Sequence, residues 1–116
     1  MADALSAALS KRVERGGRVY VFQRPSVRQL TQIDVLAARY RESLPVAALS
    51  YGVGLSDMRA MLNVMCQDPK TVARDPEGFD FGDLMEDDFE AIYAGVSEWL
   101  ASFRRPVADA PAGVGN

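Results

Sequence analysis

A chain of 116 residues is long enough for one domain with a modest hydrophobic core, without help from a metal ion or disulfides. Hydrophobic residues make up 48% and charged residues 25%, which is typical of a globular protein and argues against wholesale disorder. The single cysteine excludes an intramolecular disulfide, and no apolar run approaches the roughly 20 residues that span a bilayer. At the N-terminus the acidic Asp3 comes before the apolar residues and the basic residues follow them, the reverse of a signal peptide. We therefore expect a cytoplasmic protein that stays outside the membrane.

Opposite charges are concentrated in different halves of the chain. Residues 1–50 hold eight Lys/Arg against four Asp/Glu, a charge of +4, and residues 51–116 hold five against twelve, a charge of −7. This asymmetry fits nucleic-acid contact, self-complementary packing between subunits, or two differently charged solvated surfaces. Solvated surfaces are the simplest of the three interpretations.

Residues 1–10 are rich in Ala and Ser and predict a separate N-terminal segment, either a short helix or a frayed end. Strand-like runs follow at 11–15 and 18–23, with Gly16 and Gly17 between them. Glycine accepts the positive φ angles of tight turns, so this pattern predicts a β-hairpin. The second run is apolar on both faces, and a two-stranded hairpin needs helices to cover it.

The first long helix has clear signals at both ends. Pro25 ends the strand, Ser26 is a good N-cap, and Gln29 completes a capping box. The helix should end near Ser43, because Pro45 disfavours helical geometry at the residue before it. A core-facing stripe at helical spacing comprises Val27, Leu30, Ile33, Ala37, Tyr40 and Leu44.

The segment 46–66 is less regular. Its two glycines, Gly52 and Gly54, predict either one helix kinked there or two short helices, with Ser56 capping the second. An apolar stripe follows them, formed by Leu55, Met58, Met61, Leu62 and Met65.

Residues 67–83 predict a loop, because several of their residue pairs favour turns.

The last helix then begins with acidic residues and ends with Arg104 and Arg105, a distribution that suits the helix dipole. Pro106 stops it, and we expect the tail 106–116 to be flexible. The apolar stripe of this last helix is the clearest in the sequence and comprises Phe89, Ile92, Tyr93, Val96, Trp99, Leu100 and Phe103.

These elements predict a mainly α fold with a small N-terminal β-hairpin (α+β), in which about three helices pack on the hairpin. The single domain should cover residues 11–105. We expect its core to contain Phe22, Leu30, Ile33, Tyr40, Leu62, Phe89, Ile92, Val96 and Leu100.

Catalytic chemistry has few candidates in this chain. The absence of histidine removes the commonest general base and metal ligand at neutral pH. The sequence around Ser56 begins like a nucleophile elbow but lacks the second glycine. The carboxylates between Asp80 and Glu90 lack the spacing of a calcium loop, and Cys66 lacks a basic partner at helical spacing. We therefore predict no catalytic, cofactor or metal site and expect that the protein is not an enzyme.

Partner binding is the more promising chemistry. The methionine stripe is either part of the core or an adaptable partner surface. The aromatic stripe of the last helix presents more apolar surface than a small domain easily buries, so part of it could face a partner. The candidate contacts are Trp99, Phe103, Met58 and Met61, with burial in the core as the alternative for each.

Nucleic-acid binding is a weaker alternative. Arg24, Arg28 and Arg39 could touch phosphates, but no aromatic stacking platform accompanies them and the chain is acidic overall.

The order of elements resembles a known family. A basic hairpin ends in FQRPSVR at 22–28 and leads into a helix. An acidic FDFGDL segment at 79–84 precedes a final helix that ends in EWLASFR at 98–104. Over roughly residues 8–105 this is similar to the tail assembly chaperones of long-tailed bacteriophages and related prophages.

The resemblance implies a non-enzymatic protein that binds the tape measure protein in the host cytoplasm. Such a protein keeps that long helical partner soluble until tail-tube subunits replace it, and is absent from the finished virion. Self-association would suit this role, because head-to-tail contacts between oppositely charged halves build open spirals. The alternative is a head–tail connector or another adaptor that stays in the phage particle.

Overall fold

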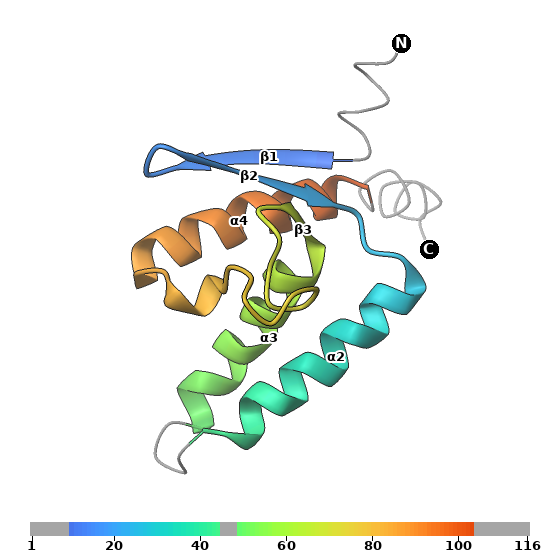
Figure 1. Ribbon diagram of the computed structural model, residues 1–116, viewed down its shortest axis with the longest axis vertical. Coiled ribbons are helices and arrows are strands. Elements are labelled where there is room, and N and C mark those ends of the chain that lie inside the picture. Colours follow the sequence, from blue (N-terminus) through green and yellow to red (C-terminus); the bar gives the residue numbers. More distant parts are fainter. Residues whose placement is uncertain (1–9, 45–48, 104–116) are drawn as a thin grey trace, which may run out of the picture.

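The computed structural model describes residues 10–44 and 49–103 (Figure 1). The predicted terminal segments fall almost entirely outside this range, as does Pro45. Within it the elements are β1 (Ser10–Arg15), β2 (Arg18–Gln23), α2 (Val27–Glu42), α3 (Leu49–Met65), β3 (Cys66–Asp68), the short 3₁₀ helix η2 (Phe81–Asp83) and α4 (Glu86–Ser102). The predicted fold class, helices packed on a small antiparallel sheet, is confirmed.

The hairpin forms where the glycine pair predicted it. Gly16 and Gly17 have φ angles of 62° and 78°, so both occupy the left-handed region that other residues avoid. The strands pair in register from Arg15 with Arg18 to Ser10 with Gln23, which leaves the two glycines as the turn.

A third strand was not predicted. The sheet has the order β1-β2-β3, and Cys66 of β3 pairs antiparallel with Phe22 of β2. The prediction that residues 67–83 form only a loop was therefore wrong at both of its ends, where β3 and η2 lie. Neither element is long enough to show a periodic pattern, because each contains 3 residues.

Helix α2 has the predicted boundaries. The Ser26 hydroxyl accepts a hydrogen bond from the Gln29 backbone, and the Gln29 side chain accepts one from the Ser26 backbone. This reciprocal pair is a capping box. The helix ends at Glu42, with Ser43 as the C-cap, as the following proline predicted.

Helix α3 is one continuous helix from Leu49 to Met65. Of the two predicted forms, the pair of short helices is therefore wrong. Ser56 lies inside the helix and is buried, so its predicted role as an N-cap is wrong too. Packing of α3 against α2 compensates for the glycines, each of which costs about 1 kcal/mol relative to alanine in a helix.

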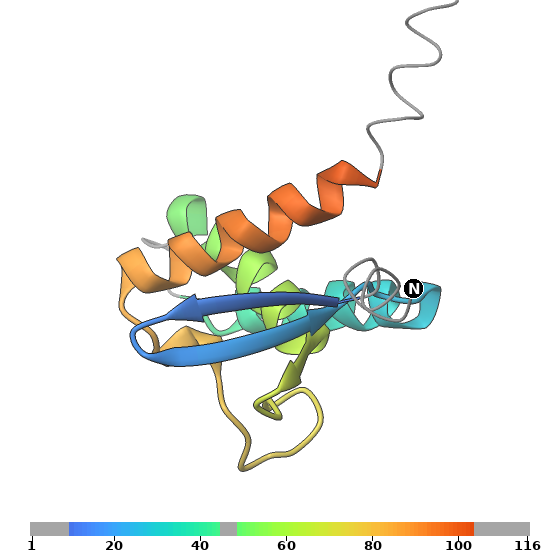
Figure 2. The ribbon, with the colours of Figure 1, turned by 90° about the horizontal axis from the view of Figure 1, so that it is seen from above.

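The core lies between the sheet, α3 and α4. Helix α4 packs along β1, and α2 packs on α3 (Figures 1 and 2). The buried apolar cluster comprises Tyr20, Phe22, Leu62, Met65, Cys66, Phe81, Phe89, Ile92 and Val96.

Five of the predicted core residues are buried: Phe22, Leu62, Phe89, Ile92 and Val96. Ile33, Tyr40 and Leu100 are half-buried.

Leu30 contradicts the core prediction, because 50% of it is exposed. Val27 of the same predicted stripe is 82% exposed. The reason is the arrangement of the helices: α2 and α3 meet near the connection between them and diverge toward the start of α2 (Figure 1). Apolar side chains of the first turns of α2 therefore stay partly exposed.

Candidate functional site

An apolar groove lies between the start of α2 and the end of α4, and we call it the α2–α4 groove. Its volume is about 300 Å³. Leu30 and Ile33 line it from α2, and Leu100 lines it from α4. The remaining lining residues are Met61 and Met65 from α3, Arg24 and Pro25 from the connection before α2, and Phe103 at the end of α4.

The composition of this groove suits an apolar ligand. Met65 is buried at its base, whereas Leu30 is half exposed at its edge. The two methionines are flexible and can repack against differently shaped apolar side chains. A groove of this kind, between two helices, can accept the apolar face of a third helix.

Aromatic side chains form one end of the groove. The rings of Trp99 and Phe103 meet edge to face, with centroids 5.3 Å apart at 77°. The Arg24 guanidinium lies 4.1 Å from the centroid of the Phe103 ring, within the range of a cation–π contact. This contact joins the end of α4 to the connection that precedes α2, at one end of the groove.

The structure brings two of the four predicted contact residues together. Met61 and Phe103 both line the α2–α4 groove. Trp99 does not line this groove but contacts Phe103, which does. Trp99 itself lines a different hollow, between α4 and Lys11 of β1. Met58, Met61 and Trp99 are each half-buried and pack against the core, which is the alternative that the sequence left open for each of them.

Leu30 and Arg24 belong to the groove but were not predicted there. Leu30 belongs to the same stripe as the buried Ala37 and the half-buried Ile33, and nothing in its spacing shows that α3 has diverged from α2 at that point. Arg24 was considered only as a phosphate contact, whereas its guanidinium lies against the Phe103 ring. The available signal for Arg24 was a basic residue three positions before the first residue of the helix.

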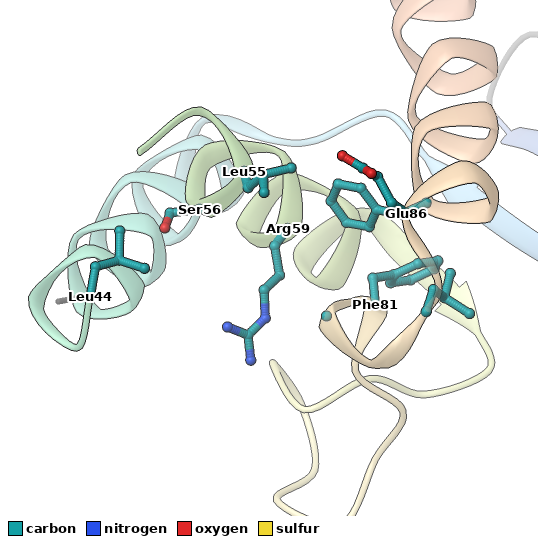
Figure 3. A pocket seen from close by; sticks show the side chains of 9 residues that line it. Leu44, Leu55, Ser56, Arg59, Phe81 and Glu86 are labelled. Atoms are coloured by element: carbon teal, nitrogen blue, oxygen red, sulfur yellow. The ribbon is translucent and has the colours of Figure 1, made fainter. Parts of the chain in front are cut away.

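A second hollow, of about 440 Å³, lies between α3, η2 and the start of α4 (Figure 3). The Arg59 side chain extends from α3 with Ser56 on one side and Phe81 on the other. Its guanidinium forms two hydrogen bonds to the Asp80 carboxylate, at 3.0 and 2.5 Å, and lies 3.8 Å from the centroid of the Tyr40 ring. Because a carboxylate of the protein already neutralises this cation, the hollow is a weak candidate for binding an anion.

Asp80 is the centre of a polar network that fixes the segment after β3. Its carboxylate also accepts hydrogen bonds from the Gly82 backbone at 2.8 Å and from the Asn63 amide at 3.1 Å. Burial alone would raise the pKa of Asp80, but the hydrogen bonds from Arg59, Gly82 and Asn63 outweigh it and lower the pKa to about 2.

Asn63 connects this network to α2 and to the loop. Its amide nitrogen donates to the Tyr40 hydroxyl at 2.9 Å, and its side-chain oxygen accepts from the Phe81 backbone at 3.0 Å. The Thr71 hydroxyl donates to the Asn63 backbone carbonyl. The network is thus a structural clamp of α2, α3 and the loop.

Cys66, the first residue of β3, is buried. Burial raises the pKa of its thiol to about 11, so the thiol is protonated at neutral pH. Over residues 10–44 and 49–103, no group of three or more acidic or cysteine side chains is arranged to hold a metal ion.

Comparison with known proteins finds no family model that matches the chain, no curated protein with a significantly similar sequence and no solved structure with a significantly similar fold. No helix in the described part of the chain is long and apolar enough to cross a bilayer. The α2–α4 groove, which gathers the exposed Leu30 with Met61 and Phe103, is therefore the candidate functional site on geometric grounds.

Proposed function

We propose that this protein is a non-enzymatic tail assembly chaperone that binds amphipathic helices of a phage tape measure protein. It would act in the host cytoplasm, keep its partner soluble, and be absent from the finished virion once tail-tube subunits take its place. The observation that carries the proposal is the α2–α4 groove, because an apolar groove between helices is the shape that accepts one face of a helix.

Two further features support the same role. A tape measure helix presents a varied apolar surface along its length, and methionines adapt to such variety at low cost. The resemblance of the segments at 22–28 and 98–104 to tail assembly chaperones involves this same region, because Arg24 and Phe103 both line the groove.

Co-expression with the tape measure protein tests the proposal. The wild-type chain should hold the partner in the soluble fraction and co-purify with it, whereas Leu30→Glu should not. A carboxylate at this half-exposed position leaves the core intact but places a charge against the apolar ligand. Val35→Glu is the matched control, since Val35 is 49% exposed on the same helix but does not line this groove.

Three outcomes contradict the proposal or restrict it. If the partner stays insoluble with the wild-type chain, the chaperone role is wrong. If Val35→Glu abolishes binding and Leu30→Glu does not, the ligand binds a different face of α2. Detection of the chain by mass spectrometry in purified virions would favour the alternative, a connector or adaptor protein that stays in the particle.

A further inference from the structure

The opposite side of α2 carries a second groove, which we call the α2–loop groove. It lies between α2 and the segment after β3, and its volume is about 640 Å³. Val27 and Val35 line it from α2, where they are 82% and 49% exposed, and Val64 and Val72 line it from the other side. Exposed valines that border an open groove indicate a surface for a partner.

The groove is also basic. Arg28 and Arg39 line it, and the described residues that line it include no carboxylate. Within the described chain neither guanidinium forms an ion pair, in contrast to Arg15, Arg41 and Arg59. A ligand for this groove should therefore combine an apolar side chain with negative charge.

The start of α4 on the same chain has this combination. Met85, directly before the helix, is 73% exposed, the largest exposure among the described large apolar side chains outside α2. Exposed carboxylates surround it in sequence, at Asp83, Glu86, Asp87 and Glu90. Asp88 is half-buried and pairs with Arg15 at 2.7 Å.

These two surfaces cannot meet within one molecule. The start of α4 and the start of α2 lie at opposite ends of the fold in both views (Figures 1 and 2). An exposed knob and a complementary groove at different places on one surface produce a head-to-tail contact between copies, which continues as a ring or an open spiral.

We propose that the α2–loop groove of one copy binds the start of α4 of a second copy. Met85 would enter between Val27 and Val35, while Asp87 and Glu90 would face Arg28 and Arg39. The phosphates of a nucleic acid could also pair with the two arginines, but they would form no favourable contact with the valines. A protein ligand with an apolar side chain and carboxylates therefore fits the groove better. This inference does not depend on the tape measure partner and concerns the chain alone.

A charge swap in the full chain tests the contact. In sedimentation experiments at about 0.1 M salt, where charges are weakly screened, the wild-type chain should form oligomers larger than the 12.7 kDa monomer. The variants R28E/R39E and D87K/E90K should each associate at least about tenfold more weakly, because like charges would face each other. Mixing the two variants should restore oligomers in which the variants alternate, since every contact between them then joins oppositely charged surfaces.

Matched variants separate this contact from general effects of charge. Arg12→Glu changes an exposed arginine of β1 and should leave association unchanged, and so should Leu30→Glu in the α2–α4 groove. Met85→Ser and Val27→Ser should weaken association without changing charge. Unfolding curves show whether each variant is folded.

A strictly monomeric wild-type chain, or oligomers that persist in both charge-reversed variants, would overturn the inference. It would also be overturned if the mixture of the two variants fails to associate while each is folded. Binding of a duplex oligonucleotide by wild-type protein but not by R28E/R39E, without self-association, would assign the groove to nucleic acid instead.

Discussion

Helices α2 and α4 both carry an apolar stripe at helical spacing, but only the stripe of α4 is covered. In α4 the side chains of Phe89, Ile92 and Val96 are buried. In α2, only Ala37 is buried. The difference lies in their neighbours, because α4 packs along β1 and the core whereas α2 packs chiefly on α3, from which it diverges. An amphipathic pattern thus shows that a face is to be covered, and does not show whether the same chain covers it.

The largest loss of stability should come from truncating a buried side chain of the α4 stripe. Ile92 is fully buried, and Ile92→Ala should lower the free energy of unfolding by about 2–5 kcal/mol through lost burial and a residual cavity. The matched change on the other helix is Leu30→Ala, which removes a similar side chain from a half-exposed site and should cost less than about 1 kcal/mol. Chemical denaturation measures both. Equal losses at the two sites would show that the two stripes are packed alike.

A second prediction concerns how α2 is held in place with so little apolar burial. Asn63 is fully buried and bonds to Tyr40 of α2, to Asp80 and to the Phe81 backbone. Asn63→Ala should cost about 2–4 kcal/mol, because several buried polar groups lose their partner. Tyr40→Phe removes only the bond to α2 and should cost about 1 kcal/mol.

Hydrogen exchange can assign these two effects to regions. In Tyr40→Phe the loss of protection should concentrate in α2, and α4 should remain protected. If α4 instead loses protection to the same extent, the two helices unfold together. Their difference in burial would then not make α2 locally less stable than α4.

The same network predicts a dependence of stability on pH. Because hydrogen bonds lower the pKa of folded Asp80 to about 2 from its ordinary 3.8, the ionised carboxylate stabilises the folded chain above about pH 4. That contribution is lost progressively as the pH falls from about 4 to about 2. Thermal unfolding across this range should show a steeper fall for the wild-type chain than for Asp80→Asn. Parallel curves for the two proteins would mean that Asp80 is not the group responsible.

The sequence predicted the parts of the fold that local rules decide. The Gly16-Gly17 turn and the Ser26 capping box depend only on neighbouring residues, and both formed as expected. Strand β3 depends on distant ones, because its pairing partner is the backbone around Phe22. No periodic signal exists in so short a strand.

The candidate site was predictable to a similar degree. Aromatic and methionine periodicity identified Met61 and Phe103, which do line the α2–α4 groove. It could not separate Met61 from Met58, which does not line that groove, because both belong to one stripe and both pack against the core. The exposure of Leu30 follows from the divergence of two helices, which no single helix pattern encodes.

The smallest change in stability should occur at the most exposed apolar side chain of α2. Val27 is 82% exposed, so Val27→Ser removes little buried area and should change the free energy of unfolding by no more than about 0.5 kcal/mol. The same substitution removes an apolar side chain from the α2–loop groove and should weaken self-association. Denaturation and sedimentation of one protein sample measure both quantities. Reduced stability with unchanged association would mean that Val27 stabilises the fold and does not bind a partner. The stripes of α2 and α4 would then differ only in how much of each is buried.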